Sequence, residues 1–262
     1  MFGTIIMDAY SKGEERSMSD YLDEICSPRD SWGWSSAGIY SFWDYNTKEI
    51  LYIGLASDLS VRYKQHNGLL TIEDGACKYL QIQEYFKAHT KLGYSVLVQS
   101  PLSQPIVHRS EKKHRDFINL STDMPISNYA GVEGLEHIRT AEGQLIESYK
   151  IIVGDIPPWN KIGGDIHSRK HASHDNYQHV VMAFSQGTPD NWLVSRCTVR
   201  ELAGSSTYAW FETLLHGLRI TMLTQNMSFD KSIEVQNKFN PYFQEQWDRI
   251  IESNYLNKKL VI

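Results

Sequence analysis

Two short strand-forming runs separated by turn-forming residues constrain the fold of this chain more than any other feature. Residues 37–43 and 49–54 are rich in β-branched and aromatic side chains, and the intervening residues 44–48 include Asp and Asn. This pattern predicts a β-hairpin with a loop of about five residues. Because side chains alternate between the two faces along a strand, we expect Tyr40 and Tyr52 on one side of the sheet.

A helix is expected directly after this hairpin. Ser57 offers an N-cap, Asp58 suits the first turn of the helix dipole, and the Asn-Gly pair at 67–68 provides a C-terminal stop. Arg62 and His66 are four residues apart on this helix, so they share one face.

A second helix, over residues 135–152, carries a carboxylate in an unusual position. Its apolar residues lie at Leu135, Ile138, Leu145, Ile146, Tyr149 and Ile152, the spacing of an amphipathic helix. Glu142 falls on this apolar stripe, whereas Glu147 falls on the opposite side. A carboxylate on a buried face is costly unless it is paired or holds a metal, so Glu142 is the better candidate for a functional role.

These residues together resemble the GIY-YIG nuclease superfamily. The chain has Gly38-Ile39-Tyr40, then Tyr52-Ile53-Gly54, and after them Arg62, His66, Glu142 and Asn160 in the order of that family. The resemblance covers residues 37–160. It implies an α+β fold with a small antiparallel three-stranded sheet flanked by helices, and residues 94–99 are expected to form the third strand.

The resemblance also implies hydrolysis of phosphodiester bonds with one divalent metal, Mg²⁺ or Mn²⁺. The metal would be held by Glu142 and would supply Lewis acidity. Arg62 would contact the phosphate, Tyr52 would position phosphate or water, and Asn160 would hold the end of the site together by hydrogen bonds.

The general base implied by the resemblance is Tyr40, helped by His66. An unperturbed tyrosine titrates near about 10, so Tyr40 would need a nearby positive charge or a base within hydrogen-bond reach. Arg62, the metal and His66 are the candidates to supply that help.

Three regions are expected along the chain. Residues 1–36 form an N-terminal extension, residues 37–163 form the nuclease core, and residues 164–262 form a C-terminal region for DNA recognition or dimerisation, with a boundary at the Gly pair 163–164. Two stretches look inserted, 77–91 and 102–133, and the spacer between Glu142 and Asn160 is longer than in the family.

The C-terminal region is expected to mix strands and helices. Residues 179–184 and 192–194 suggest short strands, Thr198 begins a capping-box pattern for a helix ending near Gly204, and a further helix follows Ser205. A final helix is expected after Pro241.

The net charge of −5 indicates that any contact with DNA is local. Candidate DNA-binding residues are Lys64, Arg109, Lys112, Lys113, Arg115, Arg169 and Lys170. A solvated helix face remains an alternative for the basic cluster 108–115. The His-rich stretch 167–179 is read as a linker or as a loop that touches the DNA backbone, with a zinc site as the weakest reading.

Cys26, Cys77 and Cys197 lie far apart, which argues against a disulfide framework and fits a reducing compartment. Neither a signal peptide nor a membrane span is evident in the sequence, so we expect a soluble, cytoplasmic protein.

The sequence therefore predicts a metal-dependent DNA endonuclease, of the site-specific restriction type. One active site cuts one strand, so cleavage of double-stranded DNA implies a homodimer or a larger homo-oligomer. The alternatives are a homing, mobile-element or repair nuclease of the same superfamily, a catalytically inactive DNA-binding protein, and an enzyme acting on RNA or a small molecule.

Overall fold

The computed structural model describes residues 2–26, 36–71, 77–100, 103–106, 111, 115, 121, 132–171, 176–188 and 191–262. In chain order its elements are β1 (Phe2–Ser11), α1 (Glu15–Cys26), β2 (Gly38–Asp44), β3 (Ile50–Ala56), α2 (Leu59–His66), α3 (Tyr79–Ala88), β4 (Lys91–Gln99), α5 (Val132–Val153), α6 (Ile166–Arg169), α7 (Asn176–Ala183), α8 (Val199–Ala203), α9 (Ser206–Gln225), α10 (Phe229–Phe239), α11 (Phe243–Glu252) and the 3₁₀ helix η3 (Tyr255–Asn257).

The predicted hairpin and the helix after it are present. β2 and β3 pair in antiparallel fashion with Tyr40 opposite Gly54. The following helix, α2, begins one residue later than its expected start, because Asp58 rather than Ser57 is the N-cap and its side chain accepts a hydrogen bond from the Val61 amide.

The α+β class is confirmed, but the sheet has four antiparallel strands, in the order β1-β4-β2-β3, rather than three. The additional strand, β1, comes from the segment expected to be an N-terminal extension. All but the two end residues of β1 are buried, so its near-continuous apolar run is covered on both faces. Residues 1–36 thus contribute to the same sheet as the predicted core.

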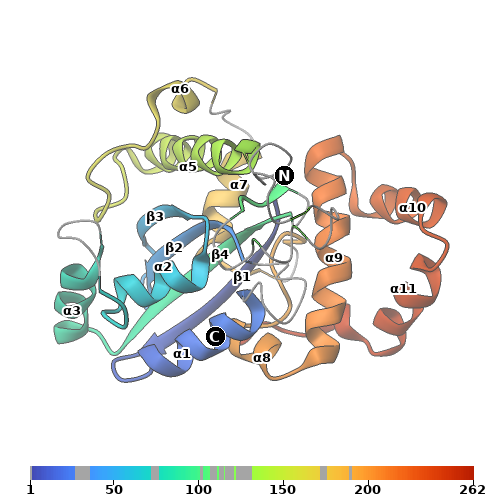
Figure 1. Ribbon diagram of the computed structural model, residues 1–262, viewed down its shortest axis with the longest axis horizontal. Helices are drawn as coiled ribbons and strands as arrows, with labels where there is room; N and C mark the ends of the chain where they lie inside the picture. The colour runs from blue at the N-terminus through green and yellow to red at the C-terminus, as the bar shows by residue number, and fades with distance from the viewer. Residues whose placement is uncertain are drawn as a thin grey trace.

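Helices cover both faces of this sheet (Figure 1). α5 and α7 pack on one face, in a cluster that includes Ile39, Trp43 and Leu97. The other face carries Tyr40 and Tyr94 and packs against α1, α2, α3 and the C-terminal helices. β3 is an edge strand, and the two helical layers meet beside it.

Two strands expected in the C-terminal region are absent. Residues 179–183 belong to the helix α7, and residues 192–194 make only an isolated parallel bridge between Val194 and Ile5. A short apolar run does not distinguish a strand from a buried helix turn by its periodicity, and here the run packs against α5. The capping box at Thr198 and the N-cap at Ser205 are both present.

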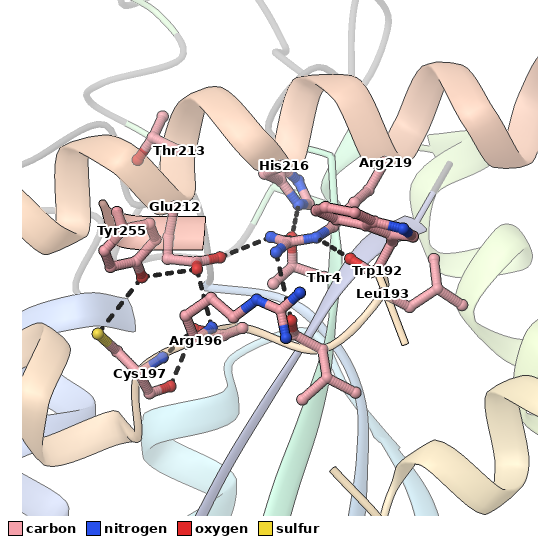
Figure 2. A network of polar contacts seen from close by, with 12 residues as sticks. Thr4, Trp192, Leu193, Arg196, Cys197, Glu212, Thr213, His216, Arg219 and Tyr255 are labelled. Carbon is pink, nitrogen blue, oxygen red and sulfur yellow. Dashed lines mark hydrogen bonds and ion pairs between the residues drawn. The ribbon is translucent and has the colours of Figure 1, made fainter. Parts of the chain in front are cut away.

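A buried polar network attaches the C-terminal helices to the sheet (Figure 2). Arg219 on α9 donates to Glu212 at 2.5 Å and to Thr4 on β1 at 3.1 Å. Glu212 also accepts hydrogen bonds from the Tyr255 hydroxyl at 2.7 Å and from the Arg196 amide at 3.0 Å. The two charged side chains are 2 % and 0 % exposed, so the charges of this pair are compensated inside the protein.

Within the described part of the chain, every helix is too short or too polar to cross a bilayer.

Candidate functional site

The candidate site is built on the buried ring of Tyr40. This side chain projects from β2 toward α2, and its ring centroid lies 5.7 Å from that of Tyr52 on β3. The Tyr40 hydroxyl rests against Gly54 on the neighbouring strand. A Cβ atom at Gly54 would lie 2.7 Å from that hydroxyl oxygen and 2.5 Å from the Tyr52 ring, so only glycine leaves room for both rings.

Two side chains of α2 reach the Tyr40 hydroxyl. His66 Nε2 lies 2.6 Å from the oxygen, and Arg62 Nε donates to it at 3.3 Å. Arg62 and His66 are one turn apart, and this spacing lets both contact a single atom. The predicted association of Tyr40, Arg62 and His66 is present in the structure.

The other nitrogen of His66 determines its protonation. The backbone amide of Lys78 donates to Nδ1 at 2.9 Å, so Nδ1 carries a lone pair. Burial, with the positive charges of Arg62 and Lys78, lowers the pKa of His66 to about 2, so the ring is neutral and its one proton is on Nε2. His66 therefore donates a hydrogen bond to Tyr40 and is not a base toward it.

The ionisation of Tyr40 is subject to opposing effects. Burial and the neighbouring Tyr52 raise the pKa of Tyr40 well above its ordinary value, whereas the charge of Arg62 and its hydrogen bond lower it. Both N–H groups at the oxygen would strengthen their hydrogen bonds to a phenolate, so they favour the ionised form.

Glu142 reaches the same region from α5, on the opposite side of the sheet. It lines a cavity of about 330 Å³ together with Tyr52, Arg62 and Gln65. Burial raises the pKa of the Glu142 carboxyl to about 7, although a hydrogen bond from the Leu55 amide and the charge of Arg62 oppose the increase.

Asn160 holds the outer edge of β3. Its side-chain amide donates to the Ile53 carbonyl at 2.8 Å and accepts from the Ile53 amide at 3.0 Å, and the Trp159 amide donates to Leu51 at 2.8 Å. Together with the Leu55 amide bound to Glu142, these contacts satisfy the backbone of alternate residues along the outer edge of the strand. The Asn160 amide therefore contacts the backbone of β3, and its role in a nuclease site stays a prediction.

The cavity offers carboxylate donors to a divalent metal. Among the described residues, no group of three His, Cys, Asp or Glu side chains gathers in one place. Mg²⁺ usually keeps several waters and takes one or two carboxylates together with substrate phosphates. Glu142, on the wall of the cavity, fits a site of this kind as one of its carboxylates.

Four of the seven candidate DNA-binding residues lie in the described part of the chain. Lys64 is ion-paired with Asp23, and Arg115 is ion-paired with Glu111 at 2.6 Å. Arg169 donates to the Gly164 carbonyl at 2.7 Å. Lys170 is exposed. Arg109, Lys112 and Lys113 lie outside the described residues.

The structure adds Lys78 to the residues predicted for the site. Lys78 is only 7 % exposed, and its Nζ lies 4.6 Å from the centroid of the Tyr52 ring. Its sequence position, at the start of the expected insertion 77–91 and just before α3, carries no pattern that points to Tyr52. Only the three-dimensional packing brings it there.

Comparison of the chain with protein families, with curated proteins and with solved structures finds no match.

Proposed function

We propose that this chain is a metal-dependent DNA endonuclease related to the GIY-YIG superfamily, of the site-specific restriction type. One observation carries the proposal: the Tyr40 oxygen accepts from both Arg62 and His66 beside a cavity lined by Arg62, Tyr52 and Glu142. Hydrolysis of a phosphodiester requires a base for water, a positive group for the phosphate and stabilisation of the leaving oxygen. The site offers residues for the first two.

In this proposal Tyr40 acts as a phenolate that accepts the proton of the attacking water. The two N–H donors stabilise that phenolate, and His66 contributes as a fixed donor. The guanidinium of Arg62 neutralises charge on the phosphate, and Tyr52 orients the phosphate or the water in the cavity.

Glu142 would hold the metal. A bound Mg²⁺ or Mn²⁺ would supply Lewis acidity toward the phosphate and the leaving 3′ oxygen. Glu142 binds such an ion only as a carboxylate, so its raised pKa makes occupancy of the site dependent on pH.

The direct test is incubation of the protein with plasmid and phage DNA in MgCl₂, beside Glu142→Ala and Arg62→Ala. Discrete fragments that are absent with both variants support the proposal. A smear, nicking or cleavage confined to branched DNA keeps the chemistry and favours a homing, mobile-element or repair nuclease. Retention of DNA without cleavage in Mg²⁺ or Mn²⁺ would overturn the enzyme proposal and leave a DNA-binding protein.

A restriction enzyme with one such site per chain also implies a homodimer or a larger homo-oligomer, because one site cuts one strand. Sedimentation equilibrium with and without cleavable DNA measures the assembly. A monomer in both conditions, combined with double-strand cleavage, would contradict this part of the proposal.

A further inference from the structure

We infer that Lys78, together with Arg62 and Lys161, forms a binding site for a backbone phosphate of the nucleic acid. The inference rests on the proposed nuclease function for the identity of the anion. It adds two residues to the site that the sequence pattern does not indicate.

The Lys78 ammonium group lies in a buried, aromatic environment. The group lies over the face of Tyr52, and the residue is almost completely buried. No carboxylate among the described residues forms an ion pair with it. A cation–π contact recovers part of the lost hydration of an ammonium group but does not neutralise its charge.

The side chains of Lys161 and Arg62 carry the same charge as Lys78. Burial lowers the pKa of Lys78, and the positive charges of Lys161 and Arg62 lower it further. Two of these cations are placed at Tyr52 by geometry, because Lys78 lies over its ring and Arg62 lines the same cavity. Such a cluster opposes folding in the free protein, and an anion that binds there relieves the repulsion.

The three cationic side chains differ in their exposure to solvent. Lys161 is exposed and directly follows Asn160 at the β3 edge, Arg62 is half-buried on the wall of the cavity, and Lys78 is buried against the Tyr52 ring. Two of the three cations, Arg62 and Lys78, thus adjoin Tyr52. A phosphate bound by them would lie next to the Tyr40–Tyr52 pair.

Lys87 provides a matched control, because it lies on α3, the helix for which Lys78 is the N-cap. It is exposed and ion-paired with Glu84 at 2.5 Å. Lys87→Met and Lys78→Met remove the same charge and keep a similar apolar stem, but only Lys78 lies at Tyr52.

The experiment uses Glu142→Gln protein in Ca²⁺, so that binding is measured without cleavage. Fluorescence anisotropy of a short labelled DNA duplex gives the affinity over a series of KCl concentrations. With Lys78→Met we expect weaker binding and a slope of log affinity against log salt that is reduced in magnitude by about 0.9, the value for one lost phosphate contact. Lys87→Met should leave both unchanged, and Lys78→Arg should restore the slope.

Thermal unfolding shows whether Lys78→Met remains folded. Because this change removes a buried charge among like charges, we expect a melting temperature equal to or above that of the parent. A folded Lys78→Met protein with the affinity and salt slope of Lys87→Met would overturn the inference and leave Lys78 as packing for Tyr52.

Calorimetric titration with inorganic phosphate separates this inference from the proposed function. Phosphate binding that is lost in Lys78→Met, in a protein that binds no duplex, would support the anion site and overturn the nuclease. Duplex binding with an unchanged salt slope would overturn the anion site and leave the nuclease proposal standing.

Discussion

The site at the β3 edge and the network beneath α9 each combine a glutamate, an arginine and a tyrosine, but arrange them differently. In the network, Arg219 and Glu212 neutralise each other at 2.5 Å, and Tyr255 and Arg196 occupy the other carboxylate oxygen. At the β3 edge, Glu142 and Arg62 both line a cavity, and Lys78 lies over the Tyr52 ring. Charges that pair with each other inside the protein stabilise the fold, whereas charged side chains on the wall of a cavity can contact a ligand.

The largest effect is expected from the residues around the Tyr40 oxygen. Tyr40→Phe removes the base and Arg62→Ala removes a donor and a charge, so we expect each to reduce the cleavage rate by about 10³-fold or more. The measurement is single-turnover cleavage of phage DNA in MgCl₂. Near-wild-type cleavage by Tyr40→Phe would exclude Tyr40 as the base.

Arg219→Met should leave the chemistry intact and destabilise the fold. The change leaves Glu212 as an uncompensated buried charge, which costs about 3–5 kcal/mol of the free energy of unfolding. Urea denaturation measures the loss. The control is Arg249→Met, which breaks an exposed pair with Glu245 and should change the free energy by less than about 0.5 kcal/mol.

His66 variants test which way its hydrogen bond points. Glutamine can place an N–H near the position of Nε2 but is not a base, so His66→Gln should retain cleavage within about tenfold of wild type. His66→Asn is too short to reach Tyr40 and should lose about 10²-fold. Equal, severe losses in both variants would indicate that His66 accepts the proton of Tyr40.

The pH dependence should follow Glu142. With its pKa near 7, cleavage at limiting Mg²⁺ should fall about tenfold per pH unit below that value and level off above it. Stability should change in the opposite direction. A raised folded pKa contributes stability below the unfolded pKa, and this contribution is lost as the pH rises through about 7. Glu142→Gln should remove this component of the stability profile.

The sequence predicted the parts of the molecule that depend on local spacing. The β2–β3 hairpin is closed by a short loop, Arg62 and His66 are one turn apart on α2, and Glu142 falls on the apolar stripe of α5. Each relationship is contained within one element or one hairpin, so the periodicity of strand or helix is sufficient.

What the sequence did not predict depends on contacts between distant segments. β1 pairs with β4 across most of the described N-terminal half, Arg219 reaches Thr4, and Lys78 reaches Tyr52 over the end of α2. In each case the two partners lie in different elements, so the periodicity of a single helix or strand does not relate them. The strand predicted at 179–184 was wrong because a short apolar run fits a helix equally well, and packing against α5 selects the helix.

A matched pair of substitutions tests the central comparison most directly: Glu142→Gln and Glu212→Gln, each measured for melting temperature and for cleavage of phage DNA in MgCl₂. We expect Glu142→Gln to keep or raise the melting temperature and to lose cleavage. We expect Glu212→Gln to lower the melting temperature and, below it, to cleave at the wild-type rate. Cleavage by Glu142→Gln at the wild-type rate, or its loss in folded Glu212→Gln, would contradict the assignment of function to the β3 edge and of stability to the buried network.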